Sequence, residues 1–377
     1  MTVATAMRVP YSYLDREFAE PDAIIEDIRR LVMTGDFTLG YPVRAFEDAF
    51  SAFTGLRYCV GAASGTDALL LALRMLGVGP GDSVIVPANT FVATAGAVAM
   101  VGADPIFADV TDDYCLDPDD LERRARPNTK AVIPVHLTGT VADMPRIMAV
   151  ARARGWVVVE DAAQALGATL DGAHAGSWGD AAEFSLHPLK MLNVWGDGGM
   201  VTAHTPEADR HLRLLRNHGL ESRDDAVLFG YNGRLSSLQA AVALRVIEGT
   251  PKAIARRRQL AEMLTAELVA LGGAVLPPVT RPGVQPVWQT YIIRVPGGRR
   301  DALRAHLLDR GVDVKVHYPV PLHLQTVGRE MGHRPGDIPN AERQAGEILT
   351  LPLHEYLTDN EVGYMLAQVR AFFGGRA

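Results

Sequence analysis

Cysteine is scarce in this chain: its 377 residues include only Cys59 and Cys115. Two isolated cysteines provide neither a disulfide framework nor the paired spacing of a structural metal site. We therefore expect a reducing compartment, no disulfide and no metal centre. Cys59 lies in an apolar run and is interpreted as a buried core residue, and Cys115 carries no motif.

An excess of basic charge and long apolar runs are also missing. The formal net charge is −7, which argues against nucleic acid or an anionic membrane surface as the main partner. No uninterrupted apolar segment is long enough to span a bilayer. The first residues lack the charged start and apolar stretch of a signal peptide. We expect a cytoplasmic protein that binds neither nucleic acid nor membrane.

What the chain does contain is an alternation of short apolar runs and helical patterns. Its composition, 48% hydrophobic and 21% charged, is that of an ordinary globular protein with a large core. Strands are predicted at 58–62, 83–86, 105–108, 131–135, 156–160, 181–185 and 200–203. Helices are predicted between them at 67–76, 94–101, 118–124 and 144–154. This alternation predicts an α/β fold, with a mostly parallel central sheet covered by helices on both faces.

The two ends of the chain have a different organisation. Residues 1–40 are interpreted as an arm with one helix at 21–31, followed by a second helix at 46–53. A long helical segment is predicted from 236 to about 271, and a Pro- and Gly-rich linker follows it. Beyond the linker, strands at 290–295 and 312–316 and helices at 300–310 and 360–372 predict a small C-terminal α+β domain. We therefore predict two domains, with boundaries at 1–250 and 251–377.

Lys190 is the candidate that carries the chemistry. It lies in Phe184-Ser-Leu-His-Pro-Leu-Lys190, and Gly196-Asp-Gly-Gly199 follows shortly after. A solvated surface lysine is the ordinary alternative, but the leucines around Lys190 favour an apolar pocket. A lysine in such a pocket has a lowered pKa and becomes a usable nucleophile, able to form an imine with an aldehyde.

Asp161 follows the apolar run Trp156-Val-Val-Val and Glu160. A surface acid or helix cap is the ordinary interpretation, and we apply it to Glu160. Charged residues are rarely buried without a partner, so an acid at the end of a buried strand indicates one. If Asp161 faced a pyridine nitrogen, it would keep that nitrogen protonated. Gln164, one turn further on, could then donate to the phenolic oxygen of the same ring.

Three further residues are candidates for holding a phosphate. Gly65 and Thr66 follow a strand and open a helix, where unpaired N–H groups favour an anion. Ser185 ends a predicted strand and could add a hydroxyl. Phe91 follows another strand and could stack on a flat ring. Each alone has an ordinary interpretation, as a helix cap or a core residue, but together they indicate a pyridoxal phosphate (PLP) site.

The order of these motifs resembles the DegT/DnrJ/EryC1/StrS family of PLP-dependent sugar aminotransferases over nearly the whole chain. The resemblance rests on Ser64-Gly-Thr-Asp-Ala-Leu69, Pro87-Ala-Asn-Thr-Phe91-Val-Ala-Thr94, Pro134-Val-His-Leu137, Glu160-Asp-Ala-Ala-Gln164-Ala, Phe184-Ser-Leu-His-Pro-Leu-Lys190, Gly230-Tyr-Asn232-Gly-Arg234-Leu and Val316-His-Tyr318-Pro. It implies a fold-type I PLP-dependent transferase. Met191 and Gly233 depart from it: asparagine commonly follows the lysine, and a bulkier residue often stands at position 233.

The resemblance also implies roles for single residues. Lys190 would carry the PLP Schiff base and shuttle a proton, Asp161 would pair with the ring nitrogen and Gln164 with the phenolic oxygen. Phe91 would stack on the ring, and the phosphate would be held by Gly65, Thr66 and Ser185. Asn232 would reach the phosphate of the neighbouring subunit's cofactor, so the protein would be a homodimer with shared active sites. The candidates for substrate contact are His187, Arg234 and Tyr318.

The expected reaction is a ping-pong transamination. Glutamate or glutamine would give its amino group to the cofactor, which would then aminate a keto-sugar, nucleotide-linked by resemblance. A keto-cyclitol, a free keto-sugar and an octulosonate remain open as acceptors. A non-transaminating PLP enzyme on the same fold, such as an epimerase or dehydratase, is the alternative reaction. No Gly-x-Gly-x-x-Gly follows the first strand, which leaves little support for a Rossmann-type nucleotide-binding protein.

Overall fold

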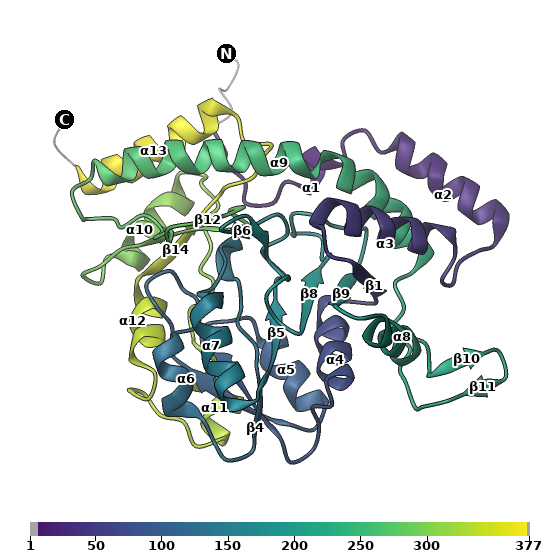
Figure 1. Cartoon of the computed structure of the whole chain (residues 1–377). Coiled ribbons are helices and arrows are strands. Elements are labelled where there is room, and N and C mark those ends of the chain that lie inside the picture. The colour runs from purple at the N-terminus through teal and green to yellow at the C-terminus, as the bar shows by residue number, and fades with distance from the viewer. Residues whose placement is uncertain (1–6, 375–377) are drawn as a thin grey trace.

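A seven-stranded sheet forms the centre of the molecule (Figure 1). The computed structural model describes residues 7–374. The strands follow the order β1-β9-β8-β5-β4-β2-β3 across the sheet. Their bounds are β1 Tyr58–Ala62, β2 Ser83–Pro87, β3 Asp104–Ala108, β4 Thr129–Val132, β5 Val157–Asp161, β8 Ala181–Ser185 and β9 Gly199–Ala203.

The sheet is mostly parallel, as predicted. The strands from β3 to β8 run in one direction, whereas β9 is antiparallel to both of its neighbours, β8 and β1. The Gly196–Gly199 turn brings the chain back into the sheet, since β9 begins at Gly199. In a parallel sheet the carboxyl ends of the strands share one edge, and ligands bind there.

Helices cover both faces of the sheet, and each face has its own apolar core. On one face, α3 (Tyr41–Thr54), α6 (Pro118–Arg124) and α7 (Met144–Arg154) bury residues such as Phe50 and Ile147. On the other face, α4 (Gly65–Met75), α5 (Val92–Met100) and α8 (Pro206–Leu215) bury residues such as Leu71. Cys59 and Cys115 are both buried and free. The predicted α/β architecture is confirmed.

The N-terminal arm leads into two short elements, α1 (Leu14–Glu17) and α2 (Asp22–Thr34). Gly35 caps the C-terminus of α2 and Gly55 that of α3, each with a positive φ that glycine adopts without strain. Helix α9 (Ser237–Val269) then spans the molecule, with α13 (Asp359–Phe373) lying along its far end (Figure 1).

A separate apolar core lies beneath the C-terminal half of α9. It is built from α10 (Arg300–Asp309), α13, β13 (Tyr291–Arg294) and β14 (Ile348–Leu351), the last two forming an antiparallel pair. The segment predicted as a strand at 312–316 makes only isolated bridges, Val312 to Val9 and Lys315 to Thr350. The single helix α9 passes through the predicted boundary at residue 250, and the two-domain division stays a prediction.

Several elements were not predicted. They include the helices α1, α8, α11 (Thr326–Glu330) and α12 (Pro339–Glu347), the hairpin β10 (Leu220–Ser222) and β11 (Asp225–Ala226), and the strands β6 (Thr169–Leu170), β7 (Ala173–His174), β12 (Val284–Gln285) and β14. The β10–β11 hairpin extends away from the body of the molecule beyond α8 (Figure 1). Within residues 7–374, no helix is both long and apolar enough to cross a membrane.

Candidate active site

A cavity of about 330 Å³ opens at the carboxyl edge of the sheet. The ends of β5 and β8 and the start of α4 form its floor, and Gln289 and Tyr318 close it from the C-terminal part of the chain. Nine of the residues selected from the sequence line this cavity together: Gly65, Thr66, Phe91, Asp161, Gln164, Ser185, His187, Lys190 and Tyr318. Strand ends far apart in sequence thus converge on one place.

Lys190 lies in the loop after β8, where its N–H donates to the His187 carbonyl at 2.8 Å. Burial, the largest effect, lowers the pKa of Lys190, while the nearby carboxyl groups of Glu183 and Asp161 oppose that shift. A lowered pKa increases the neutral fraction of the amine, which is the form that attacks a carbonyl carbon. The environment therefore suits the nucleophile expected from the sequence.

Asp161 is the last residue of β5 and is 5% exposed. Its Oδ2 accepts a hydrogen bond from Thr94 Oγ1 at 2.7 Å, and Thr94 is contacted in turn by the Thr90 hydroxyl at 3.0 Å. These hydroxyl groups orient the carboxylate from the start of α5. A buried acid held in this way can pair with a cationic ring nitrogen.

The side-chain amide of Gln164 is fixed by the backbone. Its Oε1 accepts the N–H of Thr138 at 2.9 Å. Because the oxygen is used in this contact, the amide nitrogen is the group left to donate to a ligand in the cavity. This is the orientation required to donate to a phenolic oxygen.

The expected phosphate cradle is assembled from α4 and β8. The Ser64 hydroxyl caps α4 by accepting the Asp67 N–H at 3.0 Å, and Gly65 and Thr66 begin the helix. A Cβ at Gly65 would lie 3.2 Å from Ser185 Oγ and would collide with Glu183. Glycine therefore leaves room for the Glu183 carboxyl group beside Ser185. The N–H groups of the helix start and the Ser185 hydroxyl are the donors available to an anion there.

Phe91 and Tyr318 face each other in the cavity. Their ring centroids are 5.9 Å apart with an interplanar angle of 37°. Phe91 is 54% exposed, so it is not the ordinary core phenylalanine. Burial raises the pKa of Tyr318, so this phenol stays a neutral hydrogen-bond donor.

Two of the expected site residues lie outside the cavity. Asn232 is exposed and forms a bridge with Asn217, beside the β10–β11 hairpin. Arg234 donates from Nη1 to the Asn217 side chain at 2.9 Å. Neither residue is brought to Lys190 within one chain. The role expected for Asn232 in a neighbouring subunit's site is compatible with this position.

The structure adds residues that sequence reasoning missed. Thr94, Glu183, Gln289 and His317 all line the cavity. Thr94 stands within a motif already recognised. Glu183 stands in the strand predicted at 181–185, and the two-residue periodicity of that strand places it on the same face as Ser185. Burial, followed by the charges of Lys190 and Lys315, lowers the pKa of His317 to about 4. His317 stands within the recognised motif Val316-His-Tyr318-Pro, whereas Gln289 carries no sequence signal linking it to Lys190.

The interpretation of Glu160 as a surface acid or cap is wrong. Its side chain is fully buried and accepts hydrogen bonds from the backbone N–H groups of Gly176, Trp178 and Gly179. His136 Nε2 also lies 2.8 Å from Oε2. Adjacent residues on a strand point to opposite faces, so Glu160 supports the loop behind the sheet while Asp161 faces the cavity.

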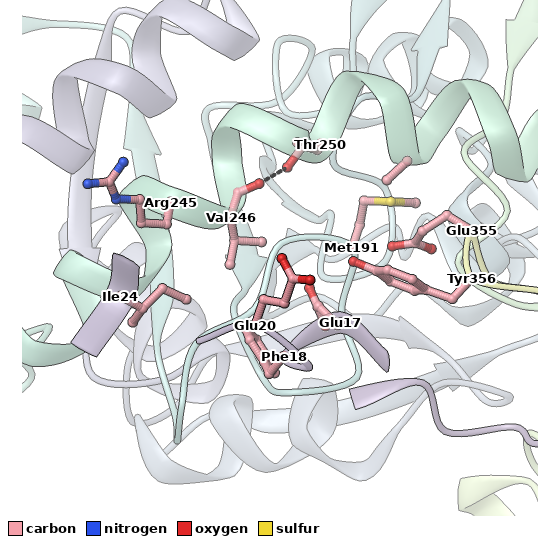
Figure 2. Close-up of a pocket in the computed structure, with 12 residues that line it drawn as sticks. Glu17, Phe18, Glu20, Ile24, Met191, Arg245, Val246, Thr250, Glu355 and Tyr356 are labelled. Carbon is pink, nitrogen blue, oxygen red and sulfur yellow. Dashed lines mark hydrogen bonds between the residues drawn. The ribbon is translucent and has the colours of Figure 1, made fainter. Parts of the chain in front are cut away.

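Met191 faces a different cavity from Lys190. This second cavity of about 190 Å³ is lined by Met191 together with Glu17, Glu355 and Tyr356 (Figure 2). Gly233 lies near Leu71 and Arg216 and does not line the site either. Within one chain, both departures from the family pattern therefore lie away from the space beside Lys190.

A family model matches residues 19–370, and its family is described as the DegT/DnrJ/EryC1/StrS aminotransferase family. The chain belongs to the DegT/DnrJ/EryC1/StrS family. The family expected from the sequence motifs is thus confirmed, and with it the class of PLP-dependent aminotransferases.

Individual relatives agree with this membership. A UDP-N-acetyl-3-dehydro-alpha-D-glucosamine 3-aminotransferase from Acidithiobacillus ferrooxidans is 39% identical over 377 residues, covering 100% of both chains. Streptomyces venezuelae DesV, solved in complex with a ketimine intermediate, superposes with a TM-score of 0.94 at 38% identity, covering 98% of this chain and 99% of DesV. Bacillus subtilis NtdA, solved with bound pyridoxamine phosphate (PMP), gives 0.92 at 30% identity, covering 99% and 87%.

The cavity residues of this DegT/DnrJ/EryC1/StrS chain fit such a cofactor. The start of α4 at Gly65 and Thr66 and the Ser185 hydroxyl line the same cavity as the Asp161 carboxyl group and the Lys190 amine. An acid for a ring nitrogen, an amide for a phenolic oxygen and an amine for an aldehyde are the complementary donor set. The PLP-type cofactor expected from the sequence therefore has a matching site.

Proposed function

We propose that this protein transfers an amino group from glutamate or glutamine to a nucleotide-linked keto-sugar by a ping-pong reaction with PLP. The observation that carries the proposal is the convergence of Lys190, Asp161 and the Gly65–Ser185 cradle in one cavity. The UDP-linked substrate in the name of the A. ferrooxidans relative supports the choice of acceptor class. The Schiff base with Lys190 is part of this proposal.

Each residue of the site has a defined task in the proposal. Asp161 keeps the ring nitrogen protonated, Gln164 donates to the phenolic oxygen, and Gly65, Thr66 and Ser185 hold the phosphate. Lys190 holds the aldehyde carbon and afterwards moves a proton from the α-carbon of the donor. Bound PLP supplies the electron sink for the carbanion formed in that step. Phe91 stacks on the ring, and His187 and Tyr318 contact the substrate.

The proposal includes a homodimer in which each site is completed by the other subunit. Asn232 and Arg234 lie outside the cavity of their own chain, beside the projecting hairpin. Phe229, next to the same hairpin, is fully exposed, and Val227 is also exposed. Exposed apolar side chains beside a polar site residue favour a surface that a partner covers. In the dimer, Asn232 binds the partner's cofactor phosphate and Arg234 contacts the substrate.

The experiment that tests the proposal separates the two half-reactions. The purified holoenzyme is treated with glutamate or glutamine, freed of the donor, and mixed with keto acceptors while the cofactor absorbance is followed. A UDP- or dTDP-linked keto-sugar should restore the starting spectrum, and mass spectrometry should find the aminated sugar. Restoration only by a free keto-sugar, an octulosonate or an inosose-type cyclitol would reassign the acceptor. An enzyme that exchanges no amino group with any donor would be a non-transaminating PLP enzyme instead.

A further inference from the structure

A second carboxyl group stands beside Asp161 in the cavity. Glu183 is in β8 and is the direct register partner of Asp161 in β5. Paired residues of neighbouring parallel strands point to the same face of a sheet, so both carboxyl groups face the cavity. Glu183 is only 1% exposed. Nothing in the proposed reaction uses this residue.

The surroundings of Glu183 supply little to compensate a negative charge. Asp161 lies beside it from β5, and Lys190 approaches from the loop after β8. From α4, Gly65 leaves room for Oε1, with which a Cβ at position 65 would collide, and Ser185 lies on the same face of β8. Oε2 is buried and has no hydrogen-bond donor. An unpartnered ionised oxygen in such a place is costly.

The environment of Asp161 and Glu183 favours one ionised and one protonated carboxyl group. Two adjacent buried carboxylates repel each other, and an ionised carboxyl group can only accept hydrogen bonds. Asp161 already receives the Thr94 hydroxyl at 2.7 Å and the Ala163 N–H at 3.3 Å, which suits an anion. Glu183 has the Ala163 N–H and the nearby charge of Lys190 to stabilise an anion. Burial, followed by the charge of Asp161, still raises its pKa well above the ordinary value.

We propose that Glu183 is a neutral carboxylic acid in the working site and that its hydroxyl group donates a hydrogen bond to Asp161. Its proton satisfies Oε2 and replaces a like-charge contact by a charge-assisted hydrogen bond. Glu183 is thus a positioning residue: it holds the acid that faces the ring nitrogen. The inference rests on the proposed role of Asp161 as the partner of that nitrogen.

A bound phosphate strengthens this arrangement. The proposed cradle at Gly65 and Ser185 adjoins Glu183, so a phosphate there adds negative charge close to Glu183. A carboxylate near further anions is disfavoured more strongly, whereas a neutral acid is not. A neutral Glu183 therefore adds no charge repulsion to a phosphate bound there.

Infrared difference spectroscopy can detect the proton directly. The carbonyl band of a neutral carboxylic acid should be present in wild type and absent from Glu183→Gln, and it should shift in D2O. Glu17 also has a raised pKa, about 7, caused mainly by burial. The measurement is therefore made at about pH 8.5, where a group with that pKa is ionised. Glu122→Gln, at a half-exposed ion pair with Arg154, is the control that should leave the band unchanged.

Cofactor binding supplies the second readout. Glu183→Gln, which keeps a neutral donor, should leave the pH profile of the cofactor absorbance in place, with PLP affinity within about threefold of wild type. Glu183→Ala, which removes the donor, should shift that profile and weaken PLP binding by about tenfold. If Glu183→Ala does not fold, the Gln variant and the infrared band carry the test.

Two results would overturn the inference: no carboxylic-acid band lost in Glu183→Gln, or a profile shifted by Gln as strongly as by Ala. Either would mean that Glu183 acts as an anion. Failure of the proposed function is a separate outcome. In that case wild type would bind PLP but exchange no amino group with any donor, and the infrared band would still report the proton on Glu183.

Discussion

The side-chain amide of Gln289 holds the backbone on both sides of Lys190. Its Nε2 donates to the Leu189 carbonyl at 2.7 Å, and its Oε1 accepts the Met191 N–H at 2.9 Å. Gln289 is 8% exposed, and it precedes β13 in the C-terminal part of the chain. The position of the lysine is therefore set from a segment remote in sequence.

We expect Gln289→Leu to reduce kcat by about tenfold to a hundredfold, because a small displacement of a reacting group is costly. The side-chain volume is nearly conserved, so the protein should still fold. Gln285→Leu is the matched control, since the Gln285 side chain is exposed and only its backbone contacts Arg258. Steady-state kinetics and circular dichroism check the pair. Equal kcat values in both variants would show that the amide contacts do not position Lys190.

Covalent capture of the cofactor should occur at Lys190 alone. The chain has four lysines, at positions 130, 190, 252 and 315, and only Lys190 lines the cavity. Borohydride treatment of the holoenzyme should therefore add the cofactor mass to the peptide containing Lys190. Lys190→Ala should lose this label and at least about a hundredfold in turnover. Lys252→Ala, on the exposed side of α9, should behave as wild type. A Lys190→Ala enzyme with normal turnover would refute the mechanism.

Asn232→Ala should weaken PLP retention by about tenfold if a neighbouring subunit completes the site, because one hydrogen bond to the phosphate is lost. Equilibrium dialysis measures the retention, and analytical ultracentrifugation measures the oligomeric state. Asn360→Ala, at an exposed position of α13, is the control. A protein that sediments as a monomer and retains PLP equally in both variants would contradict the shared site.

Glu160 should matter for stability and not for chemistry. Its buried carboxylate accepts hydrogen bonds from three backbone N–H groups and contacts His136. In Glu160→Gln one oxygen is replaced by an NH2 group, which cannot accept, so some of these donors lose their acceptor. We expect a loss of about 3 kcal/mol or more in the free energy of unfolding. Glu122→Gln, at the surface pair with Arg154, should cost no more than about 1 kcal/mol. Urea unfolding compares the two, and equal midpoints would show that the buried network contributes little.

The contact between Arg16 and Glu361 should make attachment of the N-terminal arm pH dependent. The Arg16 hydrogen bond, the largest effect, lowers the pKa of Glu361 from 4.5 to about 2. A lowered carboxyl pKa contributes stability that is fully present above pH 4.5 and is lost as pH falls towards 2. The difference in unfolding free energy between wild type and Glu361→Gln should therefore shrink below pH 4.5. A difference that stays constant throughout acidification would argue against this linkage.

The local pattern was sufficient for the central sheet and for the strand ends at which several of the candidate site residues lie. An apolar run followed by a polar residue marks the end of a buried strand, so Asp161 and Ser185 were correctly placed at strand ends. Parallel strands then carry these ends to one edge of the sheet. The prediction of a strand at 312–316 was wrong, since this segment forms only isolated bridges. An apolar run does not show whether a neighbouring strand is available to pair with it.

The sequence by itself determined the class of chemistry, since lysine, acid, amide, hydroxyl and glycine occur in family order at successive strand ends. Only the tertiary structure shows on which face of the sheet each acidic side chain lies. Glu160 contacts His136 in a buried network, whereas Asp161 and Glu183 line the cavity. The tertiary structure also brought Gln289 to Lys190 and left Asn232 outside its own chain's site. Such contacts join segments that lie far apart in the chain. Hydrophobic periodicity is a local pattern and does not link such segments, so only the folded structure brings them together.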